Sequence, residues 1–283
     1  MKVLFLIPPV LPGQRVPERV FGCTYGQHPF PVIFVLQVAA VLEQAGIQVQ
    51  YLDAPLLGFS VKKTVELLRN DASDVVCFFT VNLAKETDLR FAHTIRALHP
   101  KQTIIFFGPA ATFEPESFLI DAHTFVVRGE PEDTFKELAQ HAFLPEVCSS
   151  VRGISCLKGN NVVHNEARPL IEDLDALPFP ARHLVASFQQ YYNPKLNQRP
   201  FTVMLTSRGC PYHCRFCVPC SLNFARELEF KKANKVKPPV RMRSADNVSA
   251  EIRLLKSQGY RAISFIDDQF IWDTKRLQII GDC

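Results

Sequence analysis

Several features that define common protein classes are missing from this sequence of 283 residues. No apolar run can span a bilayer, since Gln37 and Glu43 interrupt the stretch from Val32 to Gly46. The net charge of +4 is too small to indicate nucleic-acid binding. The first residues, MKVLFLIPPVLPG, lack a small-residue cleavage site and are interpreted as a buried strand, not a signal peptide. We therefore expect a soluble, cytoplasmic protein with no membrane or nucleic-acid partner.

Glycine-rich nucleotide-binding motifs and internal repeats are also missing. Neither a G-x-G-x-x-G pattern nor a Walker loop occurs, which argues against dinucleotide and nucleoside triphosphate binding. A basic run extends from Lys231 to Arg243, but it has no interleaved aromatic residue beyond Phe230. A solvated loop is therefore favoured there over a phosphate or RNA site.

The first 140 or so residues alternate short apolar runs with helical patterns. The expected strands are Val3–Ile7, Gln48–Leu52, Val75–Phe79, Thr103–Phe107 and Phe125–Val127. The expected helices are Val32–Gln44, Val61–Arg69, Glu86–Leu98, Glu116–Asp121 and Glu132–His141. Strands without alternating polarity, separated by helices, predict a parallel sheet covered on both faces. A doubly wound sheet of this kind binds its ligand at the carboxyl ends of the strands.

A second periodic region follows residue 200. Phe201–Thr206 and Ala262–Ile266 are expected strands, with a helix at Ala245–Gln258 between them and another starting at Thr274. Between the two regions, an Asn-rich turn before Val162 predicts a small hairpin. The pattern predicts domains at residues 1–143 and 200–283, joined by a connector at 144–199.

Cysteine usage indicates a metal. Of nine cysteines, five are dispersed, and the other four lie within eleven positions, at Cys210, Cys214, Cys217 and Cys220. A secreted disulfide scaffold would be shorter and richer in cysteine, so a reducing compartment fits better. Three thiolates at C-x3-C-x2-C spacing can hold three corners of a 4Fe–4S cluster and leave one iron open. A structural zinc site with Cys220 as the fourth ligand is the alternative, although the second C-x2-C knuckle usual in zinc ribbons is missing.

This segment, from Ser207 to Cys217, resembles the signature of the radical S-adenosylmethionine superfamily, including an aromatic residue just before the third cysteine. The resemblance implies Cys210, Cys214 and Cys217 as cluster ligands. It also implies an S-adenosylmethionine site, for which the candidates are Phe216, Asp267 and Asp268. A carboxylate there would pair with the ammonium group of S-adenosylmethionine, and capping of the following turn is the alternative role.

Several segments before the cysteines occur in a recognisable order: the strand end at Pro8-Pro9, the helix–glycine–strand unit from Leu42 to Asp53, the turn at Gly108, the run from Arg128 to Glu132 and the connector from Gly153 to Pro180. This order resembles the cobalamin-binding domain found in many radical S-adenosylmethionine enzymes. The resemblance implies a Rossmann-like cobalamin domain followed by the first part of a partial (β/α)6 barrel. The D-x-H-x-x-G cobalt-ligand motif is missing, and Pro109 stands where a second glycine is usual. The residues expected to line the corrin are Thr80, Asn82, Gly108, Ala110, Thr112, Arg128 and Gly129.

This resemblance implies methyl transfer to an unreactive carbon of a small-molecule substrate, with a flavodoxin-like or ferredoxin-like electron donor. The alternatives are an oxidative cyclase of the anaerobic Mg-protoporphyrin ester type, a tRNA methylthiotransferase using Cys23, Cys77 and Cys148, and a non-catalytic cobalamin-binding or zinc-binding module. Only two barrel strands follow residue 200, so we expect a truncated barrel that binds its cofactors without turnover.

Overall fold

The computed structural model describes residues 1–14, 19–20, 30–148, 150–186, 188–212, 229–271 and 273–282. Within these residues, no helix has both the length and the apolar character that a bilayer crossing requires.

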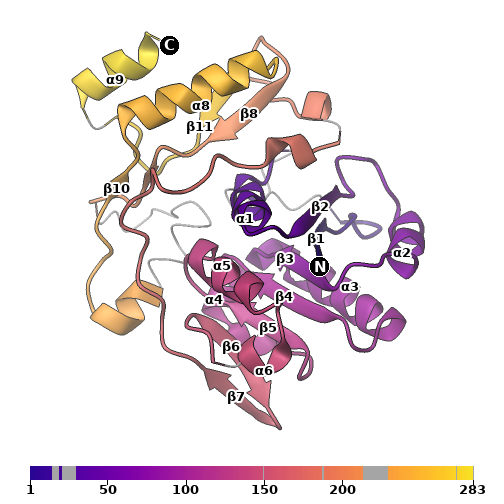
Figure 1. Cartoon of the computed structure of the whole chain (residues 1–283). Helices are drawn as coiled ribbons and strands as arrows, with labels where there is room; N and C mark the ends of the chain where they lie inside the picture. Colours follow the sequence, from indigo (N-terminus) through magenta and orange to yellow (C-terminus); the bar gives the residue numbers. More distant parts are fainter. Residues whose placement is uncertain are drawn as a thin grey trace.

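The first part of the chain forms a seven-stranded sheet with the order β2-β1-β3-β4-β5-β6-β7 (Figure 1). Its strands are β1 (Lys2–Ile7), β2 (Gln48–Asp53), β3 (Val75–Phe79), β4 (Thr103–Phe107), β5 (Thr124–Val127), β6 (Ile154–Lys158) and β7 (Asn161–His164). The five expected parallel strands are confirmed, and the expected hairpin becomes β6 and β7, which pair antiparallel. Because β6 covers the open edge of β5, the sheet continues past residue 143.

Helices cover both faces of this sheet, as the doubly wound pattern predicts. They are α1 (Ile33–Gln44), α2 (Val61–Arg69), α3 (Lys85–Leu98), α4 (Pro109–Phe113), α5 (Glu132–Gln140) and α6 (Pro145–Cys148). Successive strand residues point to opposite faces, so Phe79 packs with α1 and α5, whereas Phe78 packs with α2 and α3. A short 3-10 turn, η1 (Asn82–Ala84), precedes α3.

One expected helix is wrong. Residues Glu116–Asp121 are not helical as a unit; a 3-10 turn, η2 (Pro115–Phe118), occupies only the first half. The Asp121 carboxylate instead accepts hydrogen bonds from the His123 amide and the Thr124 hydroxyl. Aspartate competes with helical hydrogen bonding in this way, and here it turns the chain into β5.

Helix α1 links the two parts of the molecule. From Ile33 to Leu42 every residue except Gln37 is buried, although a helix on the outside of a sheet normally keeps a polar face. The reason is that α1 packs on the sheet with one side, while Phe201, Val203 and Ile266 of the second part belong to the same core. Figure 1 shows α1 between the sheet and β8 (Phe201–Met204).

The second part contains one strand–helix–strand unit. β8 pairs parallel with β11 (Ala262–Phe265), and α8 (Ala245–Ser257) connects them, followed by α9 (Thr274–Gly281). The Ser244 side chain caps α8 and the Asp273 side chain caps α9. This arrangement confirms the expected strands, with β8 ending two residues before Thr206, and gives a mixed α/β protein whose central sheet is mainly parallel.

The later part of the connector is held to both domains by buried polar contacts. It contains two 3-10 turns, η3 (Arg182–Leu184) and η4 (Phe188–Gln190). Arg182 donates to the Val203 carbonyl at 2.9 Å and lies 2.6 Å from the Glu251 carboxylate. Tyr191 donates to the Asp53 carboxylate at 2.8 Å. The connector is therefore fixed to both domains.

Candidate cofactor site

The predicted corrin residues gather at the carboxyl edge of the sheet. The Thr80 amide, just after β3, donates to the Phe107 carbonyl at 2.8 Å, and the Ala110 amide donates to the Thr80 carbonyl at 3.2 Å. Gly108, between them, has φ +102°, and a Cβ there would lie 2.8 Å from the Thr80 carbonyl oxygen. This glycine is therefore required by the backbone itself.

Pro109 does not disturb this turn. It occupies the first position of α4, where the helix needs no N–H from it. The next residues of the edge are joined by a hydrogen bond of 3.1 Å from the Gly129 amide to the Thr112 hydroxyl. Four of the seven predicted residues thus directly follow β3, β4 and β5. Ala110 and Thr112 lie in α4, and Asn82 is exposed at the start of η1.

The edge has the chemistry that a wide, flat ligand needs. Ala110, Thr112 and Gly129 are small, so a planar group could approach the backbone closely at these positions. Arg128, the one charged member of the set, is buried and lies 3.4 Å from the Glu229 carboxylate. On these grounds the residues fit a corrin ring.

Sequence reasoning missed a buried ion pair beside this edge. Arg19 donates to both oxygens of Asp88 at 2.8 and 2.7 Å and to the Phe79 carbonyl at 2.5 Å. Burial raises the pKa of Asp88, and the arginine opposes that rise. The pair fastens part of the loop between β1 and α1 over the end of β3. The available signal was Asp88 itself, a carboxylate on the apolar side of a helix, which requires a partner.

The cysteine loop begins at the same edge. β9 (Ser207–Arg208) pairs antiparallel with β10 (Arg241–Met242), so Arg208 lies opposite Arg241 at the base of the segment between them. Cys210 follows β9 and is half-buried with a free thiol. Cys214, Phe216 and Cys217 lie outside the described residues, so the ligand set and the role of Phe216 stay predictions.

Arg241 and Arg243 contradict part of the prediction that the basic run from Lys231 to Arg243 is a solvated loop. Lys231, Lys232 and Lys235 are exposed, as a solvated loop predicts, but Arg241 is buried and Arg243 is half-buried. Arg241 binds both oxygens of Glu130, at 3.0 and 2.8 Å. The reason is that the end of this segment forms β10 and pairs with β9, which buries Arg241 and partly buries Arg243.

The structure shows the surroundings of Asp267, one of the two candidate aspartates after β11. The Oδ1 atom of Asp267 accepts from the Thr206 amide at 2.9 Å and from the Ser207 hydroxyl at 2.6 Å. Its Oδ2 atom is buried and has no hydrogen-bond partner among the described residues. Burial raises the pKa of Asp267, while the hydrogen bonds from Ser207 and Thr206 oppose the rise. The turn-capping role is wrong for Asp267, because its hydrogen bonds go to Thr206 and Ser207, which lie beyond the end of β8.

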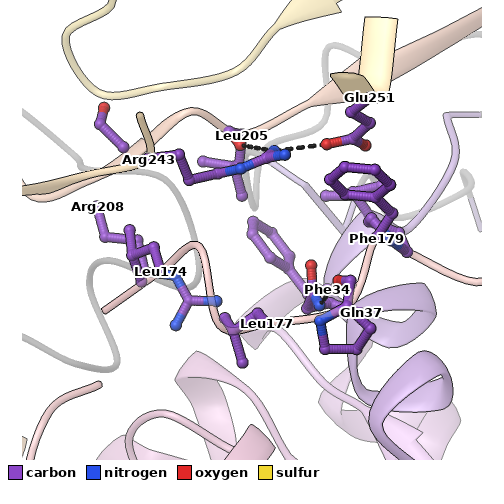
Figure 2. Close-up of a pocket in the computed structure, with 13 residues that line it drawn as sticks. Phe34, Gln37, Leu174, Leu177, Phe179, Leu205, Arg208, Arg243 and Glu251 are labelled. Carbon is purple, nitrogen blue, oxygen red and sulfur yellow. Dashed lines mark hydrogen bonds and ion pairs between the residues drawn. The ribbon is translucent and has the colours of Figure 1, made fainter. Parts of the chain in front are cut away.

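A small pocket lies between α1, the connector and the base of the cysteine loop (Figure 2). Its walls are mainly apolar, with Phe34, Leu177 and Phe179 among them. Its polar side chains are engaged: Gln37 donates to the Pro178 carbonyl at 2.6 Å, and Arg243 lies 2.5 Å from Glu251. None of the predicted corrin residues lines it. The pocket is thus part of the contact between the domains and is separate from the carboxyl edge.

Comparison with known proteins identifies the sheet domain. Residues 23–139 match the model of the B12 binding domain family. These residues are a B12-binding domain. The match covers the strands and helices that carry all seven of the predicted corrin residues.

The fold of the whole chain is that of cobalamin-dependent radical S-adenosylmethionine enzymes. The structure of OxsB, described as such an enzyme with aqua-cobalamin and S-adenosylmethionine bound, matches 99% of this chain with a TM-score of 0.67 at 18% identity. The match extends beyond the B12-binding domain into the segment after residue 200, which agrees with the expected start of a radical barrel.

Curated relatives carry two kinds of name. The uncharacterized methyltransferase PH0819 of Pyrococcus horikoshii is 28% identical over 98% of this chain. An anaerobic magnesium-protoporphyrin IX monomethyl ester cyclase of Cereibacter sphaeroides is 27% identical over 73% of it. The chain spans 55% and 34% of the lengths of these two relatives and 36% of the OxsB chain.

Proposed function

We propose that this chain is the cofactor-binding part of a cobalamin-dependent radical S-adenosylmethionine methyltransferase. In this proposal the carboxyl edge of the B12-binding domain holds the corrin, and Cys210, Cys214 and Cys217 hold a 4Fe–4S cluster. The substrate is a small molecule, and a flavodoxin-like or ferredoxin-like protein supplies electrons.

One observation carries the proposal. Arg208, two residues before the first cluster cysteine, lies 3.0 Å from Glu130, which directly follows the corrin candidate Gly129. The loop with three cysteines therefore starts at the edge where a B12-binding domain holds its ligand. Two cofactors held this close can act on one substrate, and proximity of reacting groups lowers the barrier to group transfer.

The chemistry at such a site would come mainly from the cofactors. When bound, the open iron and S-adenosylmethionine supply a 5′-deoxyadenosyl radical, and cobalamin carries a methyl group. The chain's own residues orient these groups. Asp267 would receive the ammonium group of S-adenosylmethionine on its unpartnered Oδ2 atom, since Oδ1 is already held by Thr206 and Ser207. Asp268 is the second candidate.

Two alternative functions, an oxidative cyclase and a tRNA methylthiotransferase, have unequal support. The cyclase name of one relative keeps oxidative cyclisation as a candidate for the same site. The tRNA methylthiotransferase has less support, because two of its three cysteines, Cys77 and Cys148, are buried in the core around β3 and α6. Burial raises the pKa of both thiols. Neither is placed to ligate an exposed second cluster.

The test uses the full chain, reconstituted with iron and sulfide without oxygen. It is supplied with reduced cobalamin and with S-adenosylmethionine labelled on its methyl group. Turnover of a substrate is not expected of this chain, but transfer of the label from S-adenosylmethionine to cobalamin needs no substrate. We expect that transfer to occur with the chain, and less than about a tenth of it without the chain. Retention of both cofactors without label transfer would favour the cyclase. Retention of cobalamin without iron would contradict the cluster and leave a non-catalytic cobalamin-binding module.

A further inference from the structure

Four buried charged side chains join the B12-binding domain to the base of the cysteine loop. This interdomain ion cluster consists of Glu130, Glu132, Arg208 and Arg241. Glu130 lies 3.0 Å from Arg208 and 2.8 Å from Arg241, and Glu132 lies 2.5 Å from Arg208. The Ile171 amide also donates to Glu130 at 2.7 Å. Among the residues that the structure describes, Glu130 is the one carboxylate that contacts both arginines.

The charges of the cluster are withdrawn from water. The side chains of Glu130, Glu132, Arg208 and Arg241 are 2%, 1%, 6% and 9% exposed. Burial alone would lower the pKa of Arg208, but attraction to Glu132 and Glu130 outweighs it and raises that pKa. Two carboxylates and two guanidinium groups therefore form a balanced set, and removing one member leaves a buried charge unpaired.

The two arginines of the interdomain ion cluster lie at the two ends of the segment that contains the cysteines. Arg208 and Arg241 are paired residues of β9 and β10, so together they close the base of the segment 209–240. That segment contains all three predicted cluster ligands, Cys210, Cys214 and Cys217. Glu130 thus holds both ends of the segment at once.

On its other side, Glu130 is continuous with the predicted corrin residues. It follows Arg128 and Gly129, and the Gly129 amide is fixed by the Thr112 hydroxyl at 3.1 Å. Arg128 contacts Glu229, a third point of the cysteine-bearing segment, at 3.4 Å. A displacement of the β5–α5 turn by a bound corrin would therefore be transmitted to the segment through charged contacts, not through a flexible linker.

We propose that Glu130 is a positioning residue that couples occupancy of the cobalamin site to the geometry of the cluster-bearing loop. The inference rests on the proposed function, because it needs both cofactors to bind. Each cofactor then strengthens the binding of the other, and the coupling is reciprocal. Within the described part of the chain, Glu132 contacts Arg208, and the carboxylate that contacts Arg241 is that of Glu130.

The experiment measures this coupling as a ratio of affinities. The dissociation constant of hydroxocobalamin is determined without oxygen for the full chain, once with a reconstituted iron–sulfur cluster and once free of iron. For the native chain we expect the iron–sulfur cluster to tighten cobalamin binding at least about fivefold, the lower end of usual allosteric coupling. For Glu130→Gln we expect the ratio to fall close to one.

A double variant separates positioning from simple stabilisation. Glu130→Gln alone leaves an unpaired buried cation and lowers the melting temperature. Adding Arg241→Gln restores the charge balance, so the melting temperature recovers, while the affinity ratio stays near one because the link is still broken. Glu137→Gln is the matched control. Glu137 lies in α5 and pairs with Arg168 at a partly exposed position, so we expect it to keep the native ratio.

Each outcome decides one point. A native ratio above about fivefold that is lost in both Glu130 variants supports the inference. A native chain that binds both cofactors with a ratio of one overturns the coupling and leaves the proposed function intact. A double variant that keeps the native ratio also overturns it. A native chain that binds neither cofactor overturns the proposed function and the inference with it.

Discussion

The Oδ1 atom of Asp267 lies 2.6 Å from the hydroxyl of Ser207, although the two residues are 60 positions apart. Ser207 begins the strand that leads to Cys210, and Asp267 follows the strand that pairs with β8. The contact therefore fixes one carboxylate oxygen beside the start of the cysteine loop. It also leaves Oδ2 as the buried atom without a described partner.

The first prediction concerns this carboxylate. Asp267→Asn should weaken S-adenosylmethionine binding to the reconstituted chain by about tenfold or more, because a charge-assisted hydrogen bond contributes about 1.5–3 kcal/mol. Equilibrium dialysis with labelled S-adenosylmethionine gives the affinity. Asp268→Asn is the control and should change it less than about threefold. Equal losses in the two variants would contradict the assignment to Asp267.

The second prediction concerns thiol reactivity at pH 8 in the iron-free chain. Cys210 is half-buried and should react with iodoacetamide, whereas Cys77, Cys148 and Cys156 are buried and should not. Burial raises the pKa of Cys148 to about 12, so only about one molecule in ten thousand carries the reactive thiolate at pH 8. Mass spectrometry of tryptic peptides measures the modification. Rapid alkylation of Cys77 or Cys148 in the folded chain would restore the methylthiotransferase alternative.

The third prediction compares two glycines with positive φ. Gly108 (φ +102°) has the Thr80 carbonyl oxygen 2.8 Å from its Cβ position, whereas Gly58 (φ +64°) has no atom within 4 Å. Gly58→Ala should cost about 1 kcal/mol from backbone strain alone. Gly108→Ala should cost roughly 3 kcal/mol or more, because steric overlap adds to the strain. Urea denaturation measures both, and equal costs would show that the turn can relax.

The fourth prediction concerns the contact between α8 and the connector. Glu251 is fully buried and lies 2.6 Å from Arg182 and 2.5 Å from Arg243. Glu251→Gln should lower the free energy of unfolding by about 3–5 kcal/mol, because the buried Arg182 and the half-buried Arg243 lose their charge partner. Glu66→Gln is the control, since Glu66 and Lys63 are both exposed; there we expect less than about 0.5 kcal/mol. Similar values from denaturation of the two variants would contradict the account.

Much of the fold could be predicted from the sequence, because its strands are continuous apolar runs and its helices have clear ends. α1 ends at Gln44 and α8 begins at Ala245, as the pattern indicates. The addition of β6 and β7 to the sheet could not be predicted in the same way. A hairpin can be recognised from its own turn residues, but the edge on which it docks is decided by tertiary contacts.

The candidate site also contains residues that the sequence could identify and contacts that it could not. The strand ends and the cysteine spacing are local signals, so Gly108, Gly129 and Cys210 could be named from the sequence. The partnership of Glu130 with Arg208 and Arg241 could not, because the pairs are 78 and 111 residues apart. The same holds for the pair formed by Arg19 and Asp88. In each case the sequence contains the charges, and only the fold shows which of them meet.

The most direct test of the central claim is the cofactor content of one purified preparation. The chain is reconstituted anaerobically with iron and sulfide, incubated with hydroxocobalamin and passed through a gel filtration column. We predict about four irons and about one cobalamin per chain, and loss of the iron, but not of the cobalamin, when Cys210, Cys214 and Cys217 are all replaced by alanine. A preparation that holds zinc and no iron, or one that keeps its iron after that replacement, would contradict the account.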